Sequence, residues 1–90
     1  MLMRRIVHSC SNVHVAQAAV VSIGGKFAAE FSAEAARRAV TPGVLAARMV
    51  SEFSTFAAEE DRGGLVAAAH GSDQPILSGL RYILSPAVAA

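Results

Sequence analysis

The segment 20–56 limits the fold of this chain more than any other part of it. It places a β-branched stretch, a pair of glycines and two helical patterns in one continuous register. β-Branched side chains favour strands, so residues 18–23 are predicted to form a short strand. Gly24 and Gly25 follow this strand, and two adjacent glycines end a regular element.

Two amphipathic patterns come after the glycines. Phe27, Phe31 and Ala35 recur at four-residue spacing with charged residues between them, which predicts a helix over about 26–39. A second helix is predicted over about 41–60, because threonine is a good helix cap and proline suits the first helical position. The apolar positions of this second helix are Leu45, Met49, Val50, Phe53 and Phe56.

The flanking segments are predicted to add one strand and two helices. Residues 4–10 resemble a short strand, and 65–70 fit a short helix that Gly71 ends. Residues 74–84 repeat apolar side chains at helical spacing, which predicts a last helix. The chain therefore divides into an N-terminal extension, a core and a C-terminal helical extension, at 1–17, 18–60 and 61–90.

The length of the chain makes an additional source of stability necessary. A single domain of 90 residues buries only about 60–65% of the surface of its unfolded chain. Cys10 is the one cysteine, so no internal disulfide can form, and no Cys/His set has the spacing of a zinc site. Because hydrophobic residues make up 53% of the chain, oligomerisation is the expected route to stability.

Charge is distributed unevenly along the chain, although the net charge is only +1. Residues 1–48 carry six basic and two acidic side chains, net +4, whereas 49–90 carry two basic and five acidic ones, net −3. The N-terminal half is therefore the candidate surface for an anionic partner. No apolar run approaches the ~18–20 residues that span a bilayer, so we expect a cytoplasmic protein without a membrane partner.

The spacing across 20–56 resembles the ribbon-helix-helix family, a group of small dimeric DNA-binding proteins that includes many repressors and antitoxins. The residues that match its pattern are Val21 and Ile23, Phe27, Phe31 and Ala35, Val40 and Thr41, and Leu45, Met49, Val50 and Phe53. The resemblance implies a mainly α fold with a short strand, in which two chains form an intertwined homodimer, and one or two extra C-terminal helices follow. The implied dimer core consists of Val21, Ile23, Phe27, Phe31, Leu45, Met49, Val50 and Phe53.

DNA binding is the function that this resemblance implies, as a transcriptional regulator or an antitoxin-like repressor. The outward strand positions that would enter the major groove are Ala18, Val20 and Ser22. The start of the second helix would hold a backbone phosphate through Thr41 and the amides of Gly43 and Val44. Further phosphate contacts are predicted for Lys26, Arg37 and Arg38.

Two features leave a second hypothesis open, namely a dimeric assembly or protein-interaction module on the same fold that does not bind DNA. The outward strand positions carry no charge, whereas base readout uses Arg, Lys, Asn or Gln. In addition, residues 65–84 lie outside the resemblance and carry an apolar stripe. This stripe could extend the dimer core or bind a protein partner.

No catalytic residue, metal site or cofactor is predicted, so the protein is not expected to be an enzyme. His8 and Cys10 would share one face of a strand, but His14, past a turn, does not complete a known metal-ligand spacing. A nucleophilic role for Cys10 would need a base and an orienting group. The sequence identifies neither of them.

Overall fold

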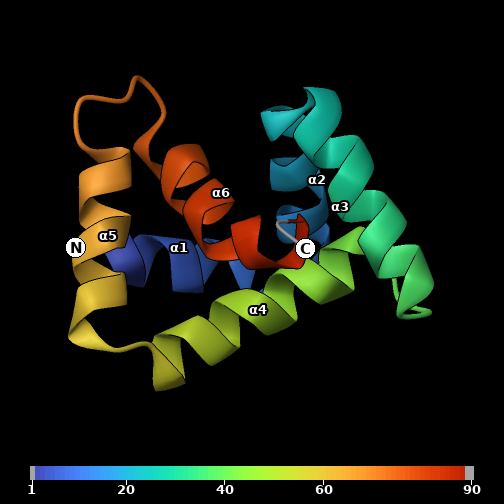
Figure 1. The fold of residues 1–90 in the computed structure, drawn as a ribbon, viewed down its shortest axis with the longest axis horizontal. Coiled ribbons are helices and arrows are strands. Elements are labelled where there is room, and N and C mark those ends of the chain that lie inside the picture. The colour runs from blue at the N-terminus through green and yellow to red at the C-terminus, as the bar shows by residue number, and fades with distance from the viewer. Residues whose placement is uncertain (1, 89–90) are drawn as a thin grey trace.

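The computed structural model describes residues 2–88, which form six helices (Figure 1). The helices are α1 (Leu2–Cys10), α2 (Val13–Ile23), α3 (Gly25–Arg37), α4 (Pro42–Phe56), α5 (Glu59–Ala69) and α6 (Pro75–Val88). α4 crosses the base of the view, and α6 runs between α5 on one side and the α2–α3 pair on the other. α1 packs against both α4 and α6.

The predicted strand at 18–23 is wrong, because these residues form the second half of α2. Residues 4–10, which were also expected to be extended, lie in α1. Since no strand occurs anywhere in 2–88, the described chain contains no ribbon. The predicted ribbon-helix-helix unit is therefore corrected to an all-helical fold.

α2 is helical because its cap and its buried face outweigh the β-branched composition. The side-chain oxygen of Asn12 accepts hydrogen bonds from the backbone amides of His14 (2.9 Å) and Val15 (3.3 Å), which caps the helix start. Ala16 and Val20, one helical turn apart, are both buried. Strand propensity depends strongly on packing context, so burial of this helical face decides the conformation.

The two helices predicted after the glycine pair are present as α3 and α4, and α3 lies within two residues of its predicted bounds. The hydroxyl of Thr41 caps α4 by accepting a hydrogen bond from the amide of Val44 at 3.2 Å, and Pro42 is the first helical residue. α4 ends at Phe56, earlier than predicted, because the backbone of Ala57 is extended.

Two helices follow α4, as predicted for the C-terminal extension, but α5 begins at Glu59 and is longer than the predicted 65–70. The first turn of α5 holds three acidic side chains, which suit the positive end of a helix dipole. A Cβ at Gly64 would lie 2.7 Å from Cζ of Tyr82, so a glycine here lets α5 and α6 approach closely. Gly71, with φ of +78°, turns the chain after α5 as predicted.

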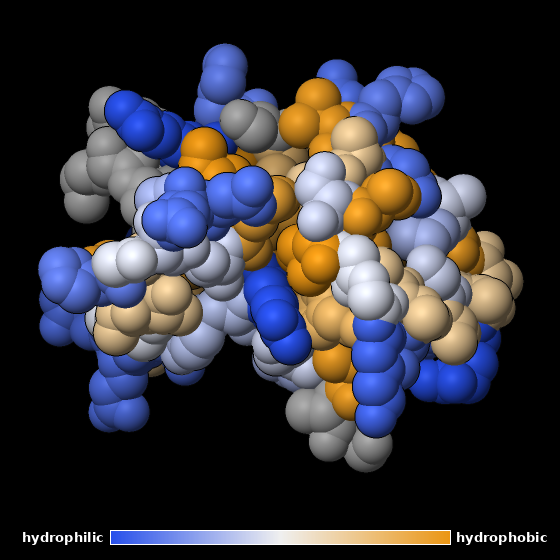
Figure 2. Space-filling model, turned by 90° about the horizontal axis from the view of Figure 1, so that it is seen from above, coloured by the Kyte–Doolittle hydropathy of each residue, from blue (hydrophilic) through white to orange (hydrophobic). Residues whose placement is uncertain are grey.

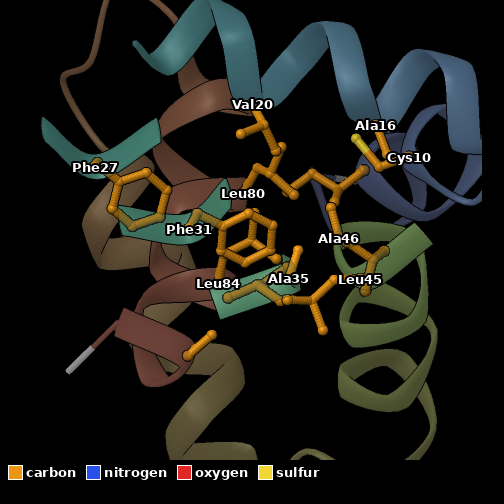
Figure 3. Packing of buried hydrophobic residues seen from close by; sticks show 14 of the residues in the cluster. Cys10, Ala16, Val20, Phe27, Phe31, Ala35, Leu45, Ala46, Leu80 and Leu84 are labelled. Atoms are coloured by element: carbon orange, nitrogen blue, oxygen red, sulfur yellow. The ribbon is translucent and has the colours of Figure 1, made fainter. Parts of the chain in front are cut away.

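One hydrophobic cluster receives side chains from all six helices. Phe31, fully buried, lies in the middle of the cluster, with Val20 and Leu80 on one side and Ala35 and Leu84 on the other (Figure 3). The cluster draws on residues from the N-terminal extension, the core and the C-terminal extension alike. A single chain therefore encloses its own core.

This core changes the physical argument for a dimer. Of the residues assigned to a dimer core, Phe27, Phe31, Leu45 and Val50 are buried within one chain. The remaining positions divide between three half-buried side chains, Ile23, Met49 and Phe53, and Val21, which is 64% exposed. Four of these eight side chains are therefore buried without a partner chain, whereas the other four stay partly or largely exposed. A homodimer stays a prediction, which sedimentation at micromolar concentration tests.

None of the helices within 2–88 has the length and apolar composition needed to cross a bilayer.

Candidate functional site

The three positions predicted to face DNA do not form one surface. Ala18 and Ser22 are exposed on α2, where the Ser22 hydroxyl donates a hydrogen bond to the Ala18 carbonyl at 3.0 Å. Val20 lies on the opposite side of the helix and is buried. Residues two positions apart share one face of a strand. In a helix each residue is rotated by about 100° from the one before, so residues two apart point in different directions. The predicted reading face is therefore not assembled.

The predicted phosphate clamp at the start of α4 has its amides engaged inside the protein. The amide of Gly43 donates a hydrogen bond to Oε1 of Gln17 at 2.8 Å, and the amide of Val44 donates to the Thr41 hydroxyl. Gly43 is buried against α2, where a Cβ at this position would lie 2.6 Å from the carbonyl oxygen of Val13. Neither amide is available to an anion in this arrangement.

Each basic side chain predicted to contact phosphate has an acidic partner on α3. Lys26 forms an ion pair with Glu30 at 3.6 Å. Arg37 and Arg38 both bond to the carboxylate of Glu34. The hydrogen bonds from Arg38 and Arg37 hold the pKa of Glu34 below its ordinary value. These pairs offset much of the positive charge on which the predicted DNA contacts depend.

The residues weighed as metal ligands or nucleophile are separated by the helical conformation. His8 is exposed on α1, whereas Cys10 is buried, and burial raises the pKa of its thiol. His14 is exposed on α2. Within the described part of the chain, no three His, Cys, Asp or Glu side chains lie close enough to hold a metal ion.

A polar hollow lies on the face seen from above (Figure 2), between the start of α6, the end of α2 and the loop after α5. Its volume is about 420 Å³, and most of its lining is polar. The hydroxyls of Ser72 and Ser78 bond to each other at 2.6 Å, and the guanidinium of Arg81 lies 5.3 Å from the centre of the Phe27 ring. Three of its polar side chains, Ser72, Ser78 and Arg81, are thus engaged with the protein itself.

An apolar hollow lies between α4, the start of α5 and the second half of α6, with a volume of about 700 Å³. We call it the α4–α6 groove. Its main apolar side chains are Met49, Phe53, Phe56, Tyr82, Ile83 and Pro86.

Two aromatic side chains hold the α4–α6 groove together, and a third lies open at its edge. The rings of Phe53 and Tyr82 meet edge to face, with centroids 6.4 Å apart and an interplanar angle of 89°, which joins α4 to α6. Phe56, one turn further along α4, is 81% exposed. It is the most exposed large hydrophobic side chain that the structure describes.

The α4–α6 groove also has an acidic edge, formed by Glu52 of α4 and Asp61 of α5. Both carboxylates are exposed, and Glu59 and Glu60 adjoin Asp61 in the first turn of α5. Arg62, which follows Asp61 in sequence, donates its hydrogen bonds to the carbonyls of Ser54 and Ala57 at the end of α4.

Comparisons with protein-family models, with curated proteins and with solved structures found no match for this chain. Phe56 was predicted as part of an apolar helix stripe, and Tyr82 lies in the segment 65–84 that was predicted to bind a protein partner, but Asp61 was not assigned to any site. No local signal marks Tyr82, because the residues that it contacts, Phe53 and Gly64, lie on other helices.

Proposed function

We propose that this protein is a helical interaction module that holds the apolar face of a partner protein's helix in the α4–α6 groove. The observation that carries this proposal is the position of Phe56, 81% exposed beside an apolar groove. Burying a phenylalanine side chain contributes about 1.5–3 kcal/mol. A side chain of this size left in water next to other apolar groups is typical of a binding surface.

The shape of the α4–α6 groove favours a helix as its occupant. Met49, Phe53 and Phe56 lie on one face of α4 and form an apolar ridge about 10 Å long, or two helical turns. A partner helix presents apolar side chains at the same spacing, which allows the two helices to pack side by side. The groove is open along one side, whereas small-molecule pockets enclose most of their ligand.

The second wall of the groove comes from the segment predicted to bind a protein partner. Tyr82 and Ile83 of α6 lie within 65–84 and face the ridge of α4 across the groove. This placement supports the hypothesis of a protein-interaction module. The proposal does not use the ribbon or the shared dimer core that this hypothesis first assumed.

The test is a titration of the isotope-labelled protein with a helix-forming peptide, followed by NMR. The peptide carries leucine at positions i, i+3, i+4 and i+7 and neutral polar residues elsewhere. We expect amide shifts concentrated at residues 49–57 and 82–86. Phe56→Ser should weaken binding at least about tenfold, since loss of one buried aromatic anchor costs about 1.4 kcal/mol or more.

Val66→Ser is the matched control, because Val66 is 60% exposed on α5 and does not line the groove. It removes an exposed apolar side chain without touching the proposed site, so the peptide affinity should not change. Shifts spread over another surface, no binding at millimolar peptide, or equal losses in the two variants would each overturn the proposal.

A further inference from the structure

We infer that the helix held in the α4–α6 groove is basic, so that its cationic side chains meet the acidic edge formed by Glu52 and Asp61. This inference rests on the proposed function and specifies the chemistry of the partner. Glu52 lies between Met49 and Phe56 on the groove-lining face of α4, and Asp61 lies at the corner where α5 begins. The carboxylates thus adjoin the apolar ridge.

No basic side chain that the structure describes forms an ion pair with the carboxylates of the acidic edge, Glu52 and Asp61. Arg62 follows Asp61 in sequence, but its guanidinium donates to the carbonyls of Ser54 (2.7 Å) and Ala57 (3.4 Å). The acidic edge therefore remains available to a positive charge brought by a partner.

Further acidic residues lie near the acidic edge and also favour a basic partner helix. Glu59 and Glu60 share the first turn of α5 with Asp61, and the half of the chain that contains them, 49–90, has a net charge of −3. An acidic helix would meet like charges on entering the groove, whereas a basic helix would be attracted. Charges at the edge of an interface contribute mainly to specificity and to the rate of association. The α4–α6 groove should therefore discriminate between partners of opposite charge.

The first experiment compares three peptides that share the leucine pattern and carry lysine, glutamine or glutamate at the polar positions next to it. Affinity is measured by fluorescence anisotropy at about 50 and about 500 mM salt. We expect the lysine peptide to bind about tenfold or more tightly than the glutamate peptide at low salt. High salt should reduce this ratio, because exposed charges are screened.

The outcomes separate the inference from the proposed function. If no peptide binds, the proposed function fails and the inference fails with it. If the glutamine peptide binds in the groove but the three affinities are equal, or the glutamate peptide binds best, only the inference fails.

A second experiment reverses the charge of the acidic edge through Glu52→Lys combined with Asp61→Lys. The matched control combines Glu30→Lys with Asp73→Lys, which changes the net charge of the protein equally at positions that do not line the groove. Circular dichroism first establishes that both variants fold.

We expect the groove variant to prefer the glutamate peptide and the control to keep its preference for the lysine peptide. A groove variant that still prefers lysine would overturn the inference. A control that loses the preference would do the same, because the selectivity would then come from net charge alone.

Discussion

The backbone amide of Gly43 donates a hydrogen bond to the side-chain oxygen of Gln17 over 2.8 Å, and this contact joins the start of α4 to α2. The two helices approach so closely here that a Cβ at Gly43 would lie 2.6 Å from the carbonyl oxygen of Val13. Only a glycine fits between them without a shift of the backbone. The predicted phosphate clamp is therefore a helix-packing site.

Gly43→Ala should destabilise the protein by about 1–3 kcal/mol, because the added methyl group forces α2 and α4 apart. Gly63→Ala is the matched control, since Gly63 lies in α5 with open space around its Cβ position. This control should stabilise the protein by about 0.5–1 kcal/mol, as alanine is the better helix former. Urea unfolding measures both, and changes of the same sign would contradict the close approach.

Arg62 holds the corner between α4 and α5, where it donates to the carbonyls of Ser54 and Ala57. Arg62→Met keeps much of the apolar stem but loses these charge-assisted bonds at the negative end of a helix, so we expect a loss of about 1–2 kcal/mol. Hydrogen exchange should quicken for amides near this corner and remain unchanged in α2. Unchanged exchange at the corner would show that Arg62 does not hold it.

Acid should weaken the fold partly through Glu34, whose pKa is lowered from 4.5 by its hydrogen bonds to Arg38 and Arg37. The unfolded carboxylate takes up a proton at higher pH than the folded one. The stabilisation is therefore complete above about pH 4.5 and is lost as the pH falls through the lowered pKa.

The measurement for Glu34 is the urea midpoint as a function of pH between about 6 and 3. Glu34→Gln should flatten the acid part of this profile. Replacing both Arg37 and Arg38 by glutamine should have the same effect, because it removes the donors that lower the pKa of Glu34. A profile that both changes leave unaltered would exclude this contribution.

Cys10 should react slowly with a thiol reagent in the folded protein. Its side chain is 1% exposed, and burial raises the pKa of the thiol, so little thiolate forms at about pH 8. We expect labelling at least about tenfold slower than in urea, since the reagent must wait for local opening. The labelling rate of free cysteine, measured with and without urea, corrects for the effect of urea on the reaction itself. Equal rates would show that the site is open.

DNA binding is the function that the resemblance in the sequence implied, and the described residues supply few groups for it. The amides of Gly43 and Val44 have internal acceptors, and the side chains of Lys26, Arg37 and Arg38 pair with acidic ones. We therefore expect no binding of mixed-sequence duplex DNA at about 50 mM salt, where phosphate contacts are strongest. Measurable affinity that falls steeply with salt would restore the original hypothesis.

Much of the helical structure after residue 24 was predictable, because its signals are local. Phe27, Phe31 and Ala35 mark one helix face by their spacing, and all three are buried. Thr41 and Pro42 mark the start of α4 by hydrogen-bonding chemistry that operates within one turn. Such signals act between residues a few positions apart, so the sequence contains them in full.

The conformation of α2 and the candidate site depended on contacts that the sequence does not show. β-Branched residues in 13–23 are compatible with a strand or a helix, and the burial of Ala16 and Val20 by other helices, together with the Asn12 cap, selects the helix. The same holds for the α4–α6 groove, where Tyr82 meets Phe53 from another helix. Spacing and caps thus determined where α3, α4 and α6 begin, but not where α5 begins. The tertiary structure alone decided which faces meet and which apolar surface stays open, because packing joins residues that are distant in sequence.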